Sequence, residues 1–276
     1  MNDIYQAANN AAEFIKNRIS FSANTAIILG TGLGDLSDQL QELYSIPYQE
    51  IPHFPISTTI SHKGELLAGK FHNTPVWVLS GRFHYYEGYS AQYVSFPVRV
   101  LKLLGVQNII ITNASGSVNP NFLPGEMVII EDHINLHPDN PLRGFNDERF
   151  GTRFPDMSDA YDKILIQKFQ MAAKECNIKK INKGVYVGVQ GPNLETPAEY
   201  RMFNIIGGDL VGMSTIPEVL IANHMGIRIL AVAIVTNLCF PPEKVRFTPV
   251  EEIIEIANQG AISLKKVLFE LLKSPL

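Results

Sequence analysis

The chain has 276 residues, of which 46% are hydrophobic, and it carries a formal net charge of −4 at pH 7. This content can bury a large core, whereas the weak negative charge gives no electrostatic footprint for nucleic acid. The two cysteines lack metal-ligand spacing, which argues against a disulfide framework or a zinc site, and no apolar run approaches the roughly twenty residues of a membrane span. The composition predicts a cytoplasmic protein that contacts neither nucleic acid nor a membrane.

The first half of the chain alternates between expected helices and strands. Apolar residues recur at helical spacing over 4–19, and a short buried strand at 25–29 ends in the glycine-rich turn 30–34. Further strands are expected at 66–71, 76–79, 108–112 and 127–130, and a further helix is expected at 91–104.

The second half continues this alternation. Helices are expected at 161–176, 197–206 and 249–272, and a strand is expected at 185–189. The apolar runs 210–213 and 227–235 flank the helical segment 217–224, and together they predict a strand, helix, strand unit. The whole pattern predicts an α/β fold: a single domain over residues 1–276, with a central mixed, largely parallel β-sheet flanked by helices.

Two features point to functional residues in this fold. Ser214 and Asn237 lie at the carboxyl ends of the two strands of the last unit, so we expect them on one rim of the sheet, where open α/β folds bind ligands. The segment 135–159 is rich in Pro, Gly, Asn, Asp and Arg and has no periodicity. So long a structureless loop is usually functional or is stabilised by a partner.

Two loops on this rim suit an anion. The turn GTGLG at 30–34 offers backbone N–H groups and the Thr31 hydroxyl, although its spacing is not that of a dinucleotide fingerprint and a plain tight turn is the alternative. The loop GRFHYYEG at 81–88 places Arg82 and His84 on one face of an extended segment, where both can donate to phosphate. The alternative is a solvated loop with an ion pair to Glu87.

Two further turns add to this set. The residues TNASG at 112–116 end the strand 108–112, and their small side chains let a ligand approach the backbone, although a simple turn would also explain them. Ser214 and Thr215 precede Pro217 at a helix start, where they either cap the helix or bind an anion. Several anion-suited turns on one rim favour an anion site.

Glu195 and Asn237 are candidates for recognising a flat heterocycle. A carboxylate only accepts hydrogen bonds, whereas a carboxamide both donates and accepts them, so the pair could read the edge of a base. The structural alternative for Glu195 is a surface carboxylate in the first turn of a helix. We also expect His62 near the site.

Taken together, these motifs resemble the trimeric purine nucleoside phosphorylases, the family that also contains methylthioadenosine phosphorylase. The resemblance spans nearly the whole chain and is carried by GTGLG (30–34), GRFHYYEG (81–88), TNASG (112–116), DHINL (132–136), NPLRGFNDERFGTRFPDMSDAYD (140–162), GPNLETPAE (191–199) and GMSTIPE (212–218). It implies reversible phosphorolysis of purine nucleosides in purine salvage, with inorganic phosphate as co-substrate and with no organic cofactor or metal. It also implies a homotrimer in which the long loop reaches a neighbouring active site.

The resemblance assigns roles to individual residues. It implies that phosphate is bound by Thr31, Arg82, His84, the Ala114 backbone N–H and Ser214. It implies that the nucleoside contacts Tyr86, Leu194, Glu195, Met213, Asn237 and, from the adjacent protomer, Phe154. His84, Glu195 and Asn237 are the catalytic candidates, and Asn237 would stabilise the negative charge of the leaving purine.

Hydrogen bonding predicts a preference for 6-oxopurine nucleosides such as inosine, guanosine and xanthosine. A 6-oxopurine has a donor at N1 that Glu195 can accept, whereas adenine has a lone pair there. The alternatives are a methylthioadenosine or adenosine phosphorylase on the same fold and a non-catalytic nucleoside-binding protein. Asn237 and Ser214 argue against the first, because the methylthioadenosine branch typically has Asp and Thr at those places. A histidine that many family members use for the 5′-hydroxyl has no counterpart within 241–252.

Overall fold

A computed structural model describes residues 3–56, 63–178 and 181–276. Its helices are α1 (Ile4–Arg18), α2 (Ala91–Val94), α3 (Phe96–Leu103), α4 (Lys163–Glu175), α5 (Pro197–Ile205), α6 (Ile216–His224) and α7 (Val250–Leu271). Its strands are β1 (Thr25–Ile28), β2 (Gln41–Pro47), β3 (Glu65–Phe71), β4 (Thr74–Ser80), β5 (Asn108–Ser117), β6 (Met127–Asn135), β7 (Asn182–Gly188), β8 (Leu210–Gly212) and β9 (Arg228–Leu238). None of the described helices is long and apolar enough to cross a membrane.

These strands form one mixed sheet in the order β2-β3-β4-β1-β5-β8-β7-β6-β9. Parallel pairings join β1 to β4 and β5, β5 to β9, and β7 to β6 and β8. Antiparallel pairings join β3 to β2 and β4, β5 to β8, and β6 to β9. Because β9 also pairs with β5, one half of the sheet closes on itself. The mixed α/β architecture expected from the sequence is confirmed.

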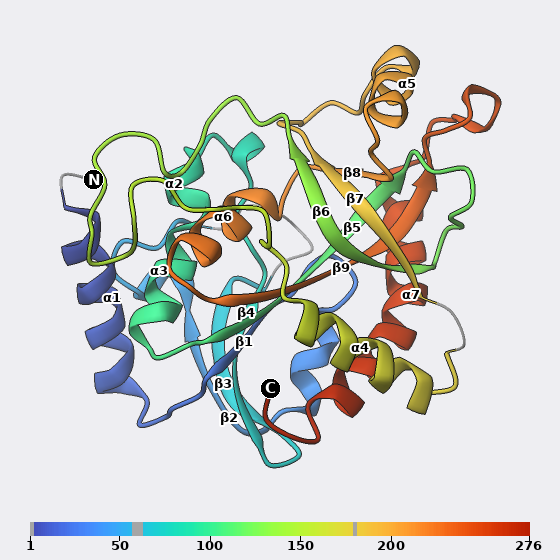
Figure 1. Ribbon diagram of the computed structural model, residues 1–276. Helices are drawn as coiled ribbons and strands as arrows, with labels where there is room; N and C mark the ends of the chain where they lie inside the picture. Colours follow the sequence, from blue (N-terminus) through green and yellow to red (C-terminus); the bar gives the residue numbers. More distant parts are fainter. Residues whose placement is uncertain (1–2, 57–62, 179–180) are drawn as a thin grey trace.

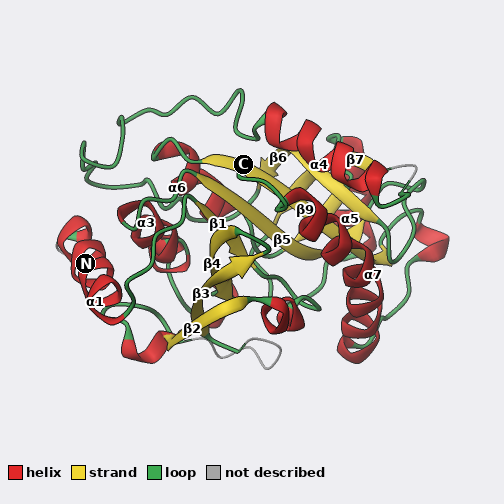
Figure 2. Cartoon of the chain, turned by 90° about the horizontal axis from the view of Figure 1, so that it is seen from below, coloured by secondary structure: helices red, strands yellow, loops and turns green. Residues whose placement is uncertain are grey.

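Helices cover the sheet on both sides (Figures 1 and 2). On one side, α1 packs against α3, and α3 packs against α6; on the other, α4 packs against α7, which packs against β9. Helix α5 projects beyond the ends of β7 and β8 at the top of Figure 1. The strands β1, β5 and β9 are buried over almost their whole lengths, which accounts for their continuous apolar runs.

Local sequence signals account for the ends of several helices. The Asp162 carboxylate accepts from the backbone N–H of Leu165 and caps α4. Thr196 and Glu199 form a capping box at the start of α5, and Pro197 occupies its first turn, where no backbone N–H donor is needed. The expected helix at 91–104 is divided at Ser95, whose hydroxyl donates to the Ala91 carbonyl.

Three details of the topology differ from expectation. Residues 112–116 are not a turn after β5 but part of it, because the strand continues to Ser117 alongside β9. Strands β8 and β9 do not form a parallel unit, since β5 is parallel to β9 and antiparallel to β8. The polar, partly exposed edge strand β2 was not expected, because it lacks the buried apolar run that marks the central strands.

Candidate active site

A cavity of about 300 Å³ lies where the ends of β5, β8 and β9 meet. Its lining includes these residues expected at the site: Thr31, Arg82, His84, Tyr86, Ala114, Leu194, Glu195, Met213, Ser214 and Asn237. The sequence therefore located the residues of one cavity. Whether each plays its assigned role stays a prediction.

Strand β5 joins β8 and β9, the two strands whose ends carry Ser214 and Asn237. Its Gly116 pairs with Val211 of β8 on one side and with Asn237 of β9 on the other. A Cβ atom at Gly116 would lie 2.5 Å from the Cys239 Sγ and 3.4 Å from the Asn237 Nδ2. A glycine is required here because any side chain would displace Cys239 and crowd Asn237.

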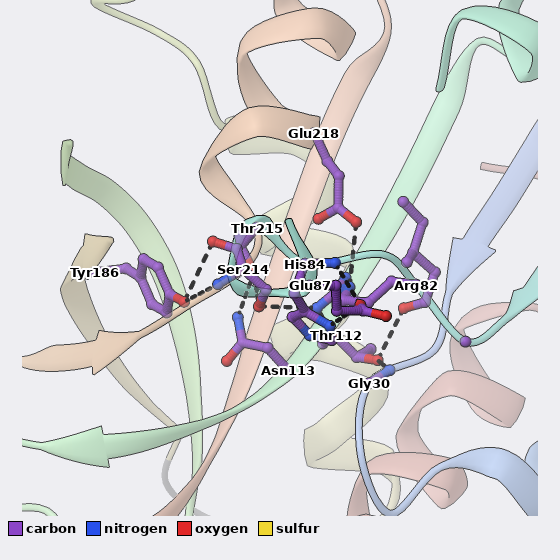
Figure 3. Close-up of polar contacts among 12 residues, drawn as sticks. Gly30, Arg82, His84, Glu87, Thr112, Asn113, Tyr186, Ser214, Thr215 and Glu218 are labelled. Atoms are coloured by element: carbon purple, nitrogen blue, oxygen red, sulfur yellow. Dashed lines mark hydrogen bonds and ion pairs between the residues drawn. The ribbon is translucent and has the colours of Figure 1, made fainter. Parts of the chain in front are cut away.

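Arg82 is the buried cation of the cavity (Figure 3). Its Nη1 donates to the Thr112 carbonyl at 2.8 Å and to the Ser214 Oγ at 3.2 Å, and its Nε lies 3.2 Å from the Glu218 Oε1. Glu218 projects from the first turn of α6 and is also buried. The carboxylate therefore offsets the cost of burying the guanidinium and fixes its direction toward Ser214.

His84 is oriented by Glu87, which follows it in the loop after β4. The Glu87 Oε1 accepts from the His84 backbone N–H at 2.8 Å and lies 3.1 Å from the His84 Nδ1. The imidazole also stacks on Tyr86, with ring centroids 4.7 Å apart. The contact with Glu87, posed as the structural alternative, is present, but the Glu87 side chain is 2% exposed rather than solvated. It fixes the ring beside the cavity instead of excluding a functional role.

Ser214 and Thr215 form a strained turn at the start of α6. The Ile216 N–H donates to the Ser214 carbonyl at 2.8 Å, and Thr215 has φ 71° and ψ −56°. These angles are those of a γ-turn, which is rare and costly for a β-branched residue. Thr215 makes no side-chain cap for α6, so the capping alternative does not account for its hydroxyl.

Two buried side chains hold this turn in place (Figure 3). The Asn113 Nδ2 donates to the Thr215 Oγ1 at 2.8 Å. The Tyr186 hydroxyl accepts from the Ser214 N–H at 3.2 Å and donates to the Ser214 carbonyl at 3.3 Å. A strained backbone persists only where surrounding contacts hold it in place, and such strain is typical of functional sites.

The glycine-rich turn after β1 packs tightly on β5. The Gly30 N–H donates to the Thr112 Oγ1 at 2.9 Å, and a Cβ at Gly30 would lie 2.6 Å from the Thr112 carbonyl oxygen. Gly32 has φ +85° and lies against the backbone of Ala257 in α7. The turn is thus structurally required, and the same close packing brings Thr31 to the cavity wall.

Glu195 and Asn237 also line the cavity. Burial raises the pKa of the Glu195 carboxyl, and a hydrogen bond from its own backbone opposes that rise. The Asn237 Oδ1 accepts from the Thr236 hydroxyl at 2.9 Å, and its Nδ2 donates to the Cys239 Sγ at 3.2 Å.

Two expected residues are not placed in the cavity. Phe154 is 87% exposed in the long loop before α4 and is not among the lining residues. Its expected position against another protomer remains a prediction. His62 lies outside the described residues.

Sequence reasoning missed residues that act through others or close the cavity. They are Asn113, Tyr186, Tyr200, Glu218, Cys239 and Ile253. The motifs 112–116 and 212–218 contain Asn113 and Glu218, so motif membership was an available signal for these two. Across residues 3–56, 63–178 and 181–276, no group of three or more His, Cys, Asp or Glu side chains could hold a metal ion.

The sequence model of the Phosphorylase superfamily matches residues 24–273. Curated relatives include purine nucleoside phosphorylase 1 of Bacillus subtilis, 46% identical over 94% of this chain and 96% of the relative. The mouse (Mus musculus) purine nucleoside phosphorylase is 42% identical over 98% of this chain and 95% of its own length.

Solved structures agree with these relatives. Schistosoma mansoni purine nucleoside phosphorylase isoform 2, in complex with cytosine and ribose-1-phosphate, has a TM-score of 0.93 at 39% identity and covers 99% of this chain and 98% of its own. A Schistosoma phosphorylase with hypoxanthine has a TM-score of 0.92 at 40% identity, with 98% of both chains covered. This chain therefore belongs to the Phosphorylase superfamily and, within it, to the family of purine nucleoside phosphorylases.

Proposed function

We propose that this protein is a purine nucleoside phosphorylase that converts purine ribo- and deoxyribonucleosides and inorganic phosphate reversibly into free base and pentose 1-phosphate, in purine salvage. The observation that carries the proposal is the pairing of two chemistries in one cavity. Arg82, His84 and Ser214 gather donors on one side, and Glu195 and Asn237 present a base-reading pair on the other. The names of its relatives and structural neighbours support the same reaction.

The donor side would bind phosphate beneath the sugar. The Arg82 guanidinium is already aimed at Ser214 by Glu218, and the His84 ring is fixed by Glu87, so little reorganisation accompanies binding. A phosphate oxygen held there attacks C1′ while the C1′–N9 bond breaks, and the bonding electrons leave with the purine. The phosphate anion also stabilises the positive charge that develops on the sugar.

Asn237 would stabilise the leaving purine. Its Oδ1 accepts from the Thr236 hydroxyl and its Nδ2 donates to the Cys239 Sγ, and all three residues line the cavity. A donor near purine N7 interacts more strongly as negative charge accumulates there. It therefore contributes more in the transition state than in the bound substrate.

We propose that the substrates are 6-oxopurine nucleosides. An ionised Glu195 accepts the N1–H of hypoxanthine or guanine, whereas adenine would leave this partly buried carboxylate facing a lone pair. Such a mismatch costs about 1–3 kcal/mol or more. A schistosome neighbour has been solved with adenosine, so preference must be measured on this chain.

We also propose a homotrimer in the cytoplasm that needs inorganic phosphate and no other cofactor. The long loop carrying the exposed Phe154 supports a neighbouring subunit that completes the pocket. Free Cys176 and Cys239 are compatible with a reducing compartment. Sedimentation of the active enzyme tests the assembly, and a fully active monomer would overturn it.

A second candidate is a methylthioadenosine phosphorylase on the same fold. Val250 and Ile253 of α7 line the cavity, close to the region where many relatives place the histidine for the 5′-hydroxyl. An apolar wall there favours an apolar 5′ substituent. The identity of Asn237 and Ser214 favours the 6-oxopurine assignment.

One assay distinguishes these functions. Base release would be followed from inosine, guanosine, xanthosine, adenosine and methylthioadenosine, each with and without phosphate. Release confined to 6-oxopurines and dependent on phosphate is the expected result. Preference for methylthioadenosine would transfer the assignment to the second candidate, and no release from any nucleoside would indicate a binding protein.

A further inference from the structure

Ser115 is a buried polar residue of β5 to which the proposed reaction assigns no role. It lines the cavity and is 2% exposed. Its hydroxyl donates to the Asn113 Oδ1 at 2.6 Å, and its backbone carbonyl accepts from the Thr236 Oγ1 at 3.2 Å. Ser115 therefore contacts one residue that leads to the phosphate-binding side chains and one that leads to Asn237.

On the phosphate side, hydrogen bonds continue from Asn113 to Ser214 (Figure 3). The Asn113 Nδ2 donates to the Thr215 Oγ1 at 2.8 Å, and this oxygen lies 3.2 Å from the Ser214 Oγ. The Ser214 Oγ also accepts from the Arg82 Nη1 at 3.2 Å. These four side chains are at most 8% exposed, so they rely on one another for hydrogen bonds.

The donors and acceptors of this series set the direction of the Ser214 hydroxyl. Because Thr215 accepts from Asn113, its own hydrogen is available to the Ser214 Oγ. Ser214 then accepts from Thr215 and from Arg82, and these two bonds occupy both of its lone pairs. The Ser214 hydrogen is left for an acceptor in the cavity, and a phosphate oxygen is such an acceptor.

On the base side, an irregularity in β9 brings Thr236 to Ser115. In the register of β5 and β9, Ser115 pairs with Val235 and Gly116 pairs with Asn237, so Thr236 is an extra residue in β9. Successive side chains of a regular strand point to opposite faces, yet Thr236 and Asn237 both line the cavity. The Thr236 hydroxyl is shared between the Ser115 carbonyl at 3.2 Å and the Asn237 Oδ1 at 2.9 Å.

We propose that Ser115 and Thr236 are positioning residues at the middle of one buried series of hydrogen bonds. Through Asn113 and Thr215, the Ser115 hydroxyl directs the Ser214 hydrogen at phosphate. Thr236, held on the Ser115 carbonyl, orients the Asn237 amide. This inference rests on the proposed phosphorolysis, and it divides the series into two sides that separate variants can break.

Ser115→Ala breaks the phosphate side and keeps the backbone carbonyl that holds Thr236. Without the donor to its Oδ1, the Asn113 amide no longer fixes Thr215, and the Ser214 hydroxyl loses its direction. We expect the KM for phosphate to rise roughly three- to fivefold, as for one weakened hydrogen bond, with the KM for inosine unchanged. Calorimetric binding of inorganic phosphate should weaken by the same factor, which gives a readout without turnover.

Ser117→Ala is the matched control. Ser117 lies on the same strand, is 0% exposed and does not line the cavity, and its hydroxyl donates to the Asn119 carbonyl at 2.9 Å. The same atom is removed from the same residue type, so the melting temperature should fall while phosphate binding stays unchanged. An unchanged KM for phosphate in Ser115→Ala, or an equal rise in both variants, would overturn the role of Ser115.

Thr236→Val breaks the base side with little change in side-chain shape. The Asn237 Oδ1 loses its donor, so the amide is held less firmly against the leaving purine. We expect kcat for inosine to fall roughly three- to tenfold, with the KM for phosphate unchanged. An unchanged kcat, or a rise in the KM for phosphate as large as the loss of kcat, would overturn the role of Thr236.

Failure of this proposal differs from failure of the proposed function. An unmodified enzyme that releases no base from any nucleoside would refute phosphorolysis itself. Phosphate-dependent release with the same kinetic constants in the unmodified enzyme, Ser115→Ala and Thr236→Val would refute only the positioning roles.

Discussion

The phosphate and base halves of the cavity are built differently. In the phosphate half, Arg82, Ser214 and Thr215 are at most 8% exposed and are held by internal hydrogen bonds. In the base half, Leu194 is 47% exposed and Glu195 is half-buried. In our proposal, the phosphate site is therefore formed before substrate arrives, whereas the base site is completed by the substrate and by a neighbouring subunit. The preorganised residues would bind phosphate, which every substrate reaction shares. The more exposed residues around Leu194 and Glu195 would set the selectivity for the base.

The largest effect should come from breaking the phosphate half at Arg82. Arg82→Ala removes the buried cation and leaves Glu218 buried without it. We expect kcat/KM for phosphate to fall by roughly 10²–10³-fold and the free energy of unfolding to fall by about 3–5 kcal/mol. Phosphate saturation kinetics and urea unfolding measure the two losses.

Glu218→Gln separates the two roles of this pair. It removes the counter-charge but leaves the guanidinium beside Ser214, so stability should fall while phosphate saturation changes less than for Arg82→Ala. If both variants lost phosphate affinity equally, phosphate binding would depend on the Arg82–Glu218 pair rather than on the guanidinium alone.

The next largest effect should come from Asn237, the leaving-group contact in our proposal. Asn237→Ala should lower kcat for inosine by roughly 10²-fold and change nucleoside affinity far less, because its donor strengthens in the transition state. Asn237→Asp should admit 6-aminopurine nucleosides. Steady-state kinetics combined with equilibrium binding separate kcat from affinity, and equal losses in both would make Asn237 a ground-state contact only.

The sequence revealed the residues that would touch substrate better than those that hold them. Arg82, Glu195 and Asn237 stand out because polar side chains follow buried strands within recognisable motifs. The partner of Arg82 does not stand out, because Ser214 is 132 residues away and Glu218 resembles any first-turn acid. Only tertiary packing makes Glu218 a buried counter-ion.

The direction of the strands was also not predictable from the sequence. The apolar runs of β8 and β9 were identified, but periodicity gives no information about direction, and the two strands are not a parallel unit. Ser214 and Asn237 nevertheless meet, because both strands pair with the end of β5. The strain at Thr215 was likewise invisible, since a β-branched residue is not expected at positive φ.

A smaller effect should follow from loosening the strained turn. Asn113→Ala removes the donor to Thr215 and the acceptor for the Ser115 hydroxyl, which lies 2.6 Å from the Asn113 Oδ1. We expect the free energy of unfolding to fall by about 1–3 kcal/mol and the KM for phosphate to rise roughly tenfold as Ser214 loses its fixed position.

Asn119→Ala is the control for that variant. Asn119 follows β5 and donates to the Asp209 carboxylate at 2.7 Å. The variant therefore loses a comparable hydrogen bond that does not involve the turn at Thr215. Its stability should fall while the KM for phosphate stays unchanged. A rise in phosphate KM for both variants would attribute the effect to the fold rather than to the turn.

The smallest effect should come from adding apolar surface at Leu194, an exposed part of the cavity wall. Leu194 lines the cavity and is 47% exposed, and Leu194→Phe would add aromatic surface against the base in our proposal. We expect the KM for inosine to fall about two- to fivefold, with the KM for phosphate unchanged, because the phosphate half is already complete. A parallel change in both constants would mean that the two halves respond as one unit, and the contrast between a rigid phosphate site and an adaptable base site would no longer hold.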